Sequence, residues 1–147
     1  MKILSESLVP DPDALPTPAD PGGAARGRER WLDRAARGDD ADLAGSIRAV
    51  ADDRSGGALL DSVLGNSPYL GQCLLADPAF ACFLLADGPQ AALVRVLAAL
   101  DAATPPGAGG ADVMAALRRA KRGVALLVGI ADMAGAWPLE TVTGTLS

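Results

Sequence analysis

Apolar residues recur at intervals of three and four along this chain from about residue 26 onward. In the segment 40–53, for example, Leu43, Ile47 and Val50 keep that spacing behind aspartates that can cap a helix, as in an amphipathic helix. The pattern repeats between turn signals over the rest of the chain. The segments expected to be helical are 28–36, 40–53, 55–66, 69–76, 79–86, 89–100, 112–134 and 139–146.

Capping residues separate these segments. Ser67-Pro68 and Asp77-Pro78 each join a favoured N-cap to a proline at the first helical position, and Ser55 is expected to cap the helix before them. The helices that begin after Ser67-Pro68 and Asp77-Pro78 carry apolar residues on nearly all sides, as buried helices do. In the expected helix 89–100 the inward positions are Leu93, Val96, Leu97 and Leu100. In the expected helix 112–134 they are Val113, Leu117, Ala120, Val124, Leu127, Val128 and Ala131.

The remaining segments divide the chain. Residues 1–25 hold five prolines between acidic residues and predict a disordered leader, because little apolar surface is available there to offset the entropy of ordering. Residues 26–103 are expected to form a helical subdomain and 104–110 a breaker-rich linker. Residues 111–147 would hold the long helix and the start of a further one, as if the open reading frame were truncated. Gly123 and Gly129 in the long helix either permit close helix contact or weaken it locally.

Composition sharpens the fold class. Half of the residues are apolar, mostly alanine, leucine and valine, and only 3% are aromatic. Alanine and leucine favour helices, whereas β-branched and aromatic residues favour strands. The sequence therefore predicts an all-α fold, an irregular bundle of about six to eight short helices with one long helix, preceded by the Pro-rich leader.

Charge and residue types limit the chemistry. The net charge of −5 disfavours nucleic-acid binding, and the lack of histidine removes the commonest general base and metal ligand. Cys73 and Cys82 lie in apolar runs and are expected to be buried and reduced, and Tyr69 is expected to pack in the core. No apolar run is long enough for a signal or a membrane span, so we expect a cytoplasmic protein without a bound metal.

The densest charge cluster lies in the long helix, at Arg118, Arg119, Lys121 and Arg122. These residues span roughly 160° of the helix, which is too wide an arc for one small ligand. The cluster is either a solvated face or a contact with a neighbouring domain or acidic partner, through Arg118, Arg119 and Arg122. Under the second interpretation, Arg118 and Arg122, one turn apart, would pair with carboxylates outside this chain.

Two blocks carry a resemblance to a known family. They are Leu64-Gly-Asn-Ser-Pro-Tyr-Leu-Gly-Gln-Cys-Leu-Leu-Ala-Asp-Pro78 and the segment from Leu117 through the basic cluster to Trp137-Pro-Leu-Glu-Thr-Val142. In their order and spacing they resemble the helical region ahead of the first nucleotidyltransferase domain in the bifunctional glutamine synthetase adenylyltransferase/adenylyl-removing enzyme. The resemblance covers roughly residues 55–147. Gly123 departs from it, because the family tends to be basic there.

The resemblance implies a function that is completed outside this chain. The family attaches AMP from ATP to a tyrosine of glutamine synthetase and removes it by phosphorolysis, using Mg²⁺ held by Asp-x-Asp carboxylates. Asp11-Pro-Asp13 and Asp40-Ala-Asp42 match those letters but lie in the leader and at a helix start, so the metal site is not transferred to them. Glutamine synthetase, the PII signalling protein and the missing C-terminal catalytic domains are the implied partners. The alternative is a complete helical protein-interaction module without catalysis.

Overall fold

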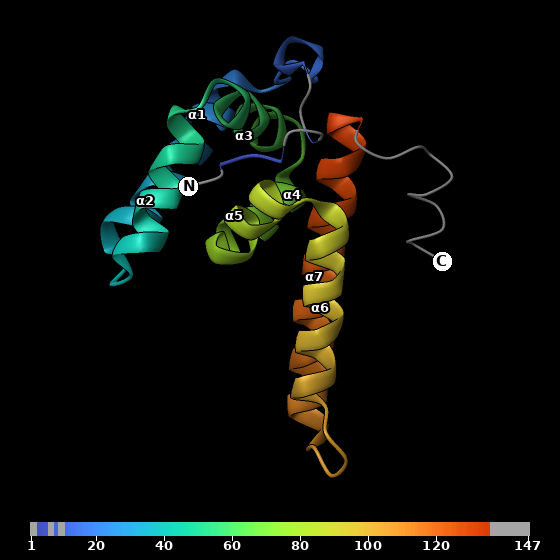
Figure 1. Cartoon of the computed structure of the whole chain (residues 1–147). Helices are drawn as coiled ribbons and strands as arrows, with labels where there is room; N and C mark the ends of the chain where they lie inside the picture. The colour runs from blue at the N-terminus through green and yellow to red at the C-terminus, as the bar shows by residue number, and fades with distance from the viewer. Residues whose placement is uncertain (1–2, 6–7, 9–10, 136–147) are drawn as a thin grey trace.

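The computed structural model describes residues 3–5, 8 and 11–135, and all of their regular structure is helical (Figure 1). The all-α prediction is confirmed, while the helix expected at 139–146 lies outside the described residues. The elements are the 3₁₀ turn η1 (Pro12–Ala14) and the helices α1 (Pro21–Arg37), α2 (Ala41–Asp52), α3 (Arg54–Asn66), α4 (Pro68–Ala76), α5 (Pro78–Asp87), α6 (Pro89–Ala103) and α7 (Gly110–Ala134).

Helices α1, α2 and α3 pack together at one end of the molecule (Figure 1). Trp31 of α1 is fully buried, and its indole Nε1 donates a 2.9 Å hydrogen bond to the carbonyl of Ile47 in α2. This bond satisfies the only polar group of a large buried side chain, which a buried tryptophan requires. The contact therefore fixes α2 across α1.

Arg28 links the same three helices through its guanidinium. It forms a bidentate pair with Asp61 of α3, from Nε to Oδ1 and from Nη2 to Oδ2, both at 3.1 Å. It also donates to the carbonyls of Ala51 at 3.1 Å and Gly57 at 2.9 Å. One planar side chain thus holds the end of α2 and the start of α3 against α1, a geometry that lysine does not reproduce.

Most of the expected caps are present. Asp40, Ser67 and Asp77 accept hydrogen bonds from the backbone N–H three residues on, at the starts of α2, α4 and α5. The prediction that Ser55 caps α3 was wrong, because Asp53 accepts from Gly56 N at 2.8 Å and the helix begins before Ser55. The carboxylate competes successfully for the free N–H groups of that first turn.

The first helix begins earlier than the predicted residue 28. Helix α1 begins at Pro21, because Asp20 caps it and proline suits its first position. Before it, Leu8 is buried, and Ser5 N donates to Leu85 O of α5 at 2.6 Å. Asn66, at the end of α3, donates to Thr17 O and accepts from Ala19 N. The described part of the leader therefore lies against the helices.

Helices α4 and α5 connect this bundle to the rest of the molecule. They meet at a bend of 100°, and their combined length and apolar composition, taken alone, would allow a bent membrane span. Within the described part of the chain, no single helix is long and apolar enough to cross a membrane.

Helices α6 and α7 form an antiparallel hairpin that projects from the bundle (Figure 1). Residues 104–109 form its loop, where a linker was predicted, and Gly110 already belongs to α7. The division of the chain into two parts at this linker stays a prediction. Helix α7 ends where expected, at Gly135, whose backbone is left-handed with φ of 67°.

Candidate interface on the last two helices

The buried face of α7 differs from the predicted stripe. Leu127, Val128 and Ala131 are buried as expected, but Leu117 is 45% exposed. On α6, Leu97 was expected to point inward and is 54% exposed. The residues of α7 that are buried are Ala116, Gly123, Leu126, Leu127, Val128, Ile130 and Ala131.

The two glycines of α7 explain this orientation. A Cβ at Gly123 would lie 2.9 Å from Val96 Cγ2 of α6, and one at Gly129 would lie 2.5 Å from Leu70 Cδ1 of α4. Both glycines therefore permit close helix contact, which decides between the two roles left open by the sequence. Because they face α6 and α4, they rotate Leu117 away from the interior.

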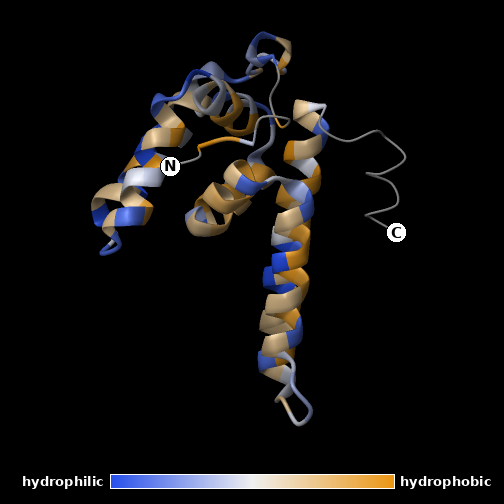
Figure 2. Ribbon diagram, viewed as in Figure 1, coloured by the Kyte–Doolittle hydropathy of each residue, from blue (hydrophilic) through white to orange (hydrophobic). Residues whose placement is uncertain are grey.

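The basic cluster lies beside this buried face. At about 100° per residue, Arg119 and Arg122 stand roughly 60° and 120° from Ala116 on one side. Arg118 and Lys121 stand roughly 160° and 140° from Ala116, on the face of the helix away from the interior, and all four side chains are exposed. None of them forms a salt bridge with any residue of the described ranges. Figure 2 shows a group of hydrophilic positions midway along the hairpin.

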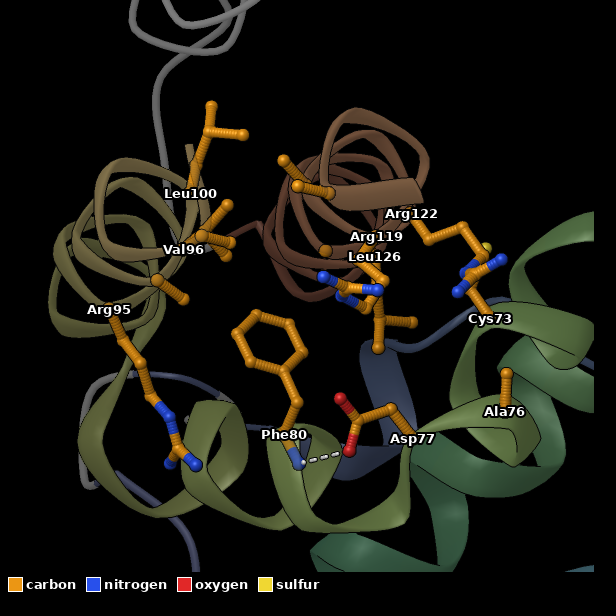
Figure 3. A pocket seen from close by; sticks show the side chains of 15 residues that line it. Cys73, Ala76, Asp77, Phe80, Arg95, Val96, Leu100, Arg119, Arg122 and Leu126 are labelled. Atoms are coloured by element: carbon orange, nitrogen blue, oxygen red, sulfur yellow. Dashed lines mark hydrogen bonds between the residues drawn. The ribbon is translucent and has the colours of Figure 1, made fainter. Parts of the chain in front are cut away.

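A cavity of about 360 Å³ opens on the side where Arg119 and Arg122 lie (Figure 3). Alanines of both hairpin helices form its walls, and Phe80, Val96 and Leu126 form an apolar floor. Arg118 and Lys121 do not line it. The lining residues are Cys73, Ala76, Asp77, Phe80, Arg95, Val96, Ala99, Leu100, Ala103, Ala116, Arg119, Ala120, Arg122, Gly123 and Leu126.

The cavity has one acidic and three basic lining residues. The Asp77 carboxylate faces the arginines of α7 in Figure 3; its Oδ1 accepts a hydrogen bond from Phe80 N at 3.1 Å, and it forms no salt bridge with them among the described residues. Arg95 of α6 is partly engaged as well, because its guanidinium stacks 4.5 Å from the centre of the Phe83 ring. Arg119 and Arg122 therefore remain the basic groups best able to bind an external anion.

Tyr69 extends the site along α4. The prediction that it packs in the core was wrong, since it is 48% exposed. Cys73 raises the pKa of the Tyr69 phenol electrostatically and by a hydrogen bond, burial adds to this, and nearby Arg122 opposes it. The phenol therefore stays protonated at neutral pH, as a neutral group close to Arg122.

The two cysteines are free thiols, as predicted. Cys73 is buried beside the cavity and Cys82 is half-buried on α5. Burial raises the pKa of the Cys82 thiol to about 11, so this sulfur is a poor nucleophile at neutral pH. Among residues 3–5, 8 and 11–135, no three His, Cys, Asp or Glu side chains lie together where they could hold a metal.

The structure separates the predicted contact residues by their position relative to the cavity. Arg119 and Arg122 line the same cavity, whereas Arg118 does not line it. The predicted contact of Arg118, Arg119 and Arg122 with a neighbouring domain stays a prediction. The cavity residues Arg95 and Asp77 were not predicted as part of a site. Arg95 precedes Ala99 by one turn on the cavity side of α6, whereas Asp77 was predicted only as a helix cap.

Comparison with known proteins finds similar enzymes that share one name. No family model and no solved structure matches the chain. The bifunctional glutamine synthetase adenylyltransferase/adenylyl-removing enzyme of Rhodopseudomonas palustris strain BisB5 is 42% identical over 108 residues, 73% of this chain and 11% of that enzyme. The enzyme of the same name from Bradyrhizobium sp. strain BTAi1 is 30% identical over 146 residues, 99% of this chain and 14% of that enzyme.

A third enzyme of that name, from Xanthobacter autotrophicus strain Py2, is 42% identical over 82 residues, 56% of this chain and 8% of the enzyme. The chain thus spans only 8% to 14% of the length of these curated relatives. The similarity to this enzyme family, indicated by the sequence blocks at residues 64–78 and 117–142, is confirmed.

Proposed function

We propose that this chain is a non-catalytic helical part of a glutamine synthetase adenylyltransferase/adenylyl-removing enzyme, supporting catalytic domains that lie elsewhere in that enzyme. The observation that carries this proposal is the extent of the match. Up to 99% of the chain aligns with an enzyme of which it represents only 14%. The larger part of such an enzyme, and with it the room for the catalytic domains, lies outside the aligned segment.

The reactions in which the chain would take part are the attachment of AMP to glutamine synthetase and its removal. We propose that ATP and Mg²⁺ bind the domains that carry out these reactions. The metal would be held by those domains, since the described residues of this chain bring no three potential ligands among His, Cys, Asp and Glu together. Glutamine synthetase and the PII signalling protein would be partners of the whole enzyme, in the cytoplasm.

The hairpin of α6 and α7 is the surface best suited to support another domain. It projects from the bundle, carries exposed apolar residues such as Leu97 and Leu117, and holds basic residues without an acidic partner in the described structure. Exposed apolar groups next to charged groups are typical of contacts between domains. A scaffold role therefore accounts for features that an isolated helical bundle does not need.

A chimera tests the proposal. In the R. palustris enzyme, the segment aligned with this chain would be replaced by residues 1–147, and AMP transfer to and removal from glutamine synthetase would be measured. We expect both activities to be retained. A second enzyme lacking the aligned segment is the control, and it should lose activity because its catalytic domains lose a supporting surface.

Two results would contradict the proposal. One is a soluble, folded chimera without either activity, which would show that this chain cannot replace the aligned segment. The other is full activity in the enzyme that lacks the segment. Either result would favour the alternative of an independent interaction module, which should then bind a partner as an isolated chain.

A further inference from the structure

We propose that the groove between α6 and α7, at the cavity bordered by Arg119 and Arg122, receives an acidic amphipathic helix from the rest of the enzyme. This inference rests on the proposed function and specifies the surface by which the chain contacts its neighbouring domain. It replaces the pair Arg118 and Arg122 with the pair that the structure brings to one cavity.

The walls of the groove favour a helix as the occupant. Ala99 and Ala103 of α6 and Ala116 and Ala120 of α7 line it, and they have the smallest side chains that a helix wall can present short of glycine. Small residues let a third helix approach to about 8–10 Å between axes. The groove would then become the centre of a three-helix arrangement, with the apolar floor around Val96 covered.

The charges favour an acidic occupant. Arg119 and Arg122 are three positions apart on the same side of α7, without a carboxylate partner among the described residues. Carboxylates spaced three or four positions apart on a facing helix would match them, since such side chains lie on one helix face. Asp77, the acidic residue at the cavity, caps α5 through Oδ1 and forms no salt bridge with either arginine among the described residues.

The extent of the relatives supplies a source for that helix. About nine-tenths of the R. palustris enzyme lies outside the aligned segment. The cavity is lined mainly by apolar side chains, among them Phe80, Val96 and Leu126, and a small anion would not need such a surface. A protein segment is therefore favoured over a free phosphate or nucleotide, which the arginines alone would also attract.

Photo-crosslinking in the chimera tests the assignment. A photo-reactive amino acid would replace Ala103 in the groove or, as a control, Ala98, which is exposed on the far side of α6. We expect the groove position to crosslink to one acidic helix of the enzyme, identified by mass spectrometry, and the control position to give no such product.

Charge reversal supplies the second measurement. Arg119→Glu with Arg122→Glu should lower the yield of that crosslink by about tenfold, because two charge-assisted contacts become repulsive. Arg118→Glu with Lys121→Glu changes the charge equally outside the cavity and should leave the yield within about twofold. Reversal of the acidic residues identified on the partner helix should restore the yield in the first variant.

Each other outcome has a definite meaning. Equal effects of the two reversals, or a crosslink to a segment without carboxylates, would overturn the inference in a chimera that is still active. A crosslink abolished by ATP or inorganic phosphate would assign the groove to a small anion instead. An inactive chimera would reject the proposed function itself and this inference with it.

Discussion

The guanidinium of Arg28 offers the clearest test of how the bundle is held together. Arg28→Ala removes two hydrogen bonds to the carbonyls of Ala51 and Gly57 and a bidentate pair with Asp61. The two side chains of the pair are one-third and two-fifths exposed, so water can replace part of what is lost. The carbonyls lose partners at the point where α2 ends and α3 begins.

The expected loss follows from these contacts. A hydrogen bond from a charged donor contributes about 1.5–3 kcal/mol when buried, and a half-exposed ion pair about 0–1 kcal/mol. With partial replacement by water, we expect Arg28→Ala to lower the free energy of unfolding by about 2–4 kcal/mol. This is a large fraction of the roughly 5–15 kcal/mol typical of a domain. Arg28→Lys should lose about half as much, because an ammonium cannot serve both carbonyls and the carboxylate.

Urea unfolding followed by circular dichroism at 222 nm measures the effect. Arg54→Ala is the matched control, because Arg54 pairs with Asp13 through side chains that are both more than three-quarters exposed. We expect it to cost less than about 0.5 kcal/mol. The reasoning is refuted if the two variants differ by less than that amount while the slope of the unfolding transition stays unchanged.

Three further predictions concern a buried serine, two glycines and a half-buried cysteine. The Ser62 hydroxyl is buried without a hydrogen-bond partner, so Ser62→Ala should raise the free energy of unfolding by about 1 kcal/mol, and a lower melting temperature would contradict this. Gly123→Ala brings a methyl group to 2.9 Å from Val96 and should destabilise by about 1 kcal/mol, whereas Gly45→Ala, with open space, should stabilise by about 1 kcal/mol in the same melts. Burial raises the pKa of Cys82 from 9.0 to about 11, so the folded state holds its proton where the unfolded state ionises. Stability should therefore fall as pH rises from about 9 to about 11, and Cys82→Ala should reduce that fall in urea titrations.

Local signals predicted the helices well. The caps at Asp40, Ser67 and Asp77 follow from a short polar side chain placed before a helical segment, and they depend on few residues beyond the first turn. The same holds for the end of α7 at Gly135, where a left-handed residue without a Cβ is favoured. The all-α class needed only this local information.

The faces of α6 and α7 could not be predicted in the same way. Both helices carry apolar residues on several sides, so spacing alone allows more than one inward face. The choice depends on Gly123 and Gly129, whose lack of a side chain matters only when α6 and α4 are in place. The error at Leu117 then displaced the candidate site, because it separated Arg119 and Arg122 from the cavity that they border.

The leader shows a second limit of local information. Its prolines correctly exclude a long helix before Pro21, but the contacts that hold its described residues come from Leu85 and Asn66, far along the chain. Such contacts join residues about 50 or more positions apart, so they produce no regular spacing of apolar residues from which they could be predicted.

The projection of the hairpin has a mechanical consequence. Helix α7 has 25 residues and is therefore about 37 Å long at about 1.5 Å per residue. Its second half packs closely on α5 at Gly123 and on α4 at Gly129. The direction in which the hairpin projects therefore depends on how closely α7 packs at those two glycines. A tilt of α7 by a few degrees there would displace the loop at residues 104–109 by more than an ångström, so a bulkier residue at either glycine would shift that loop.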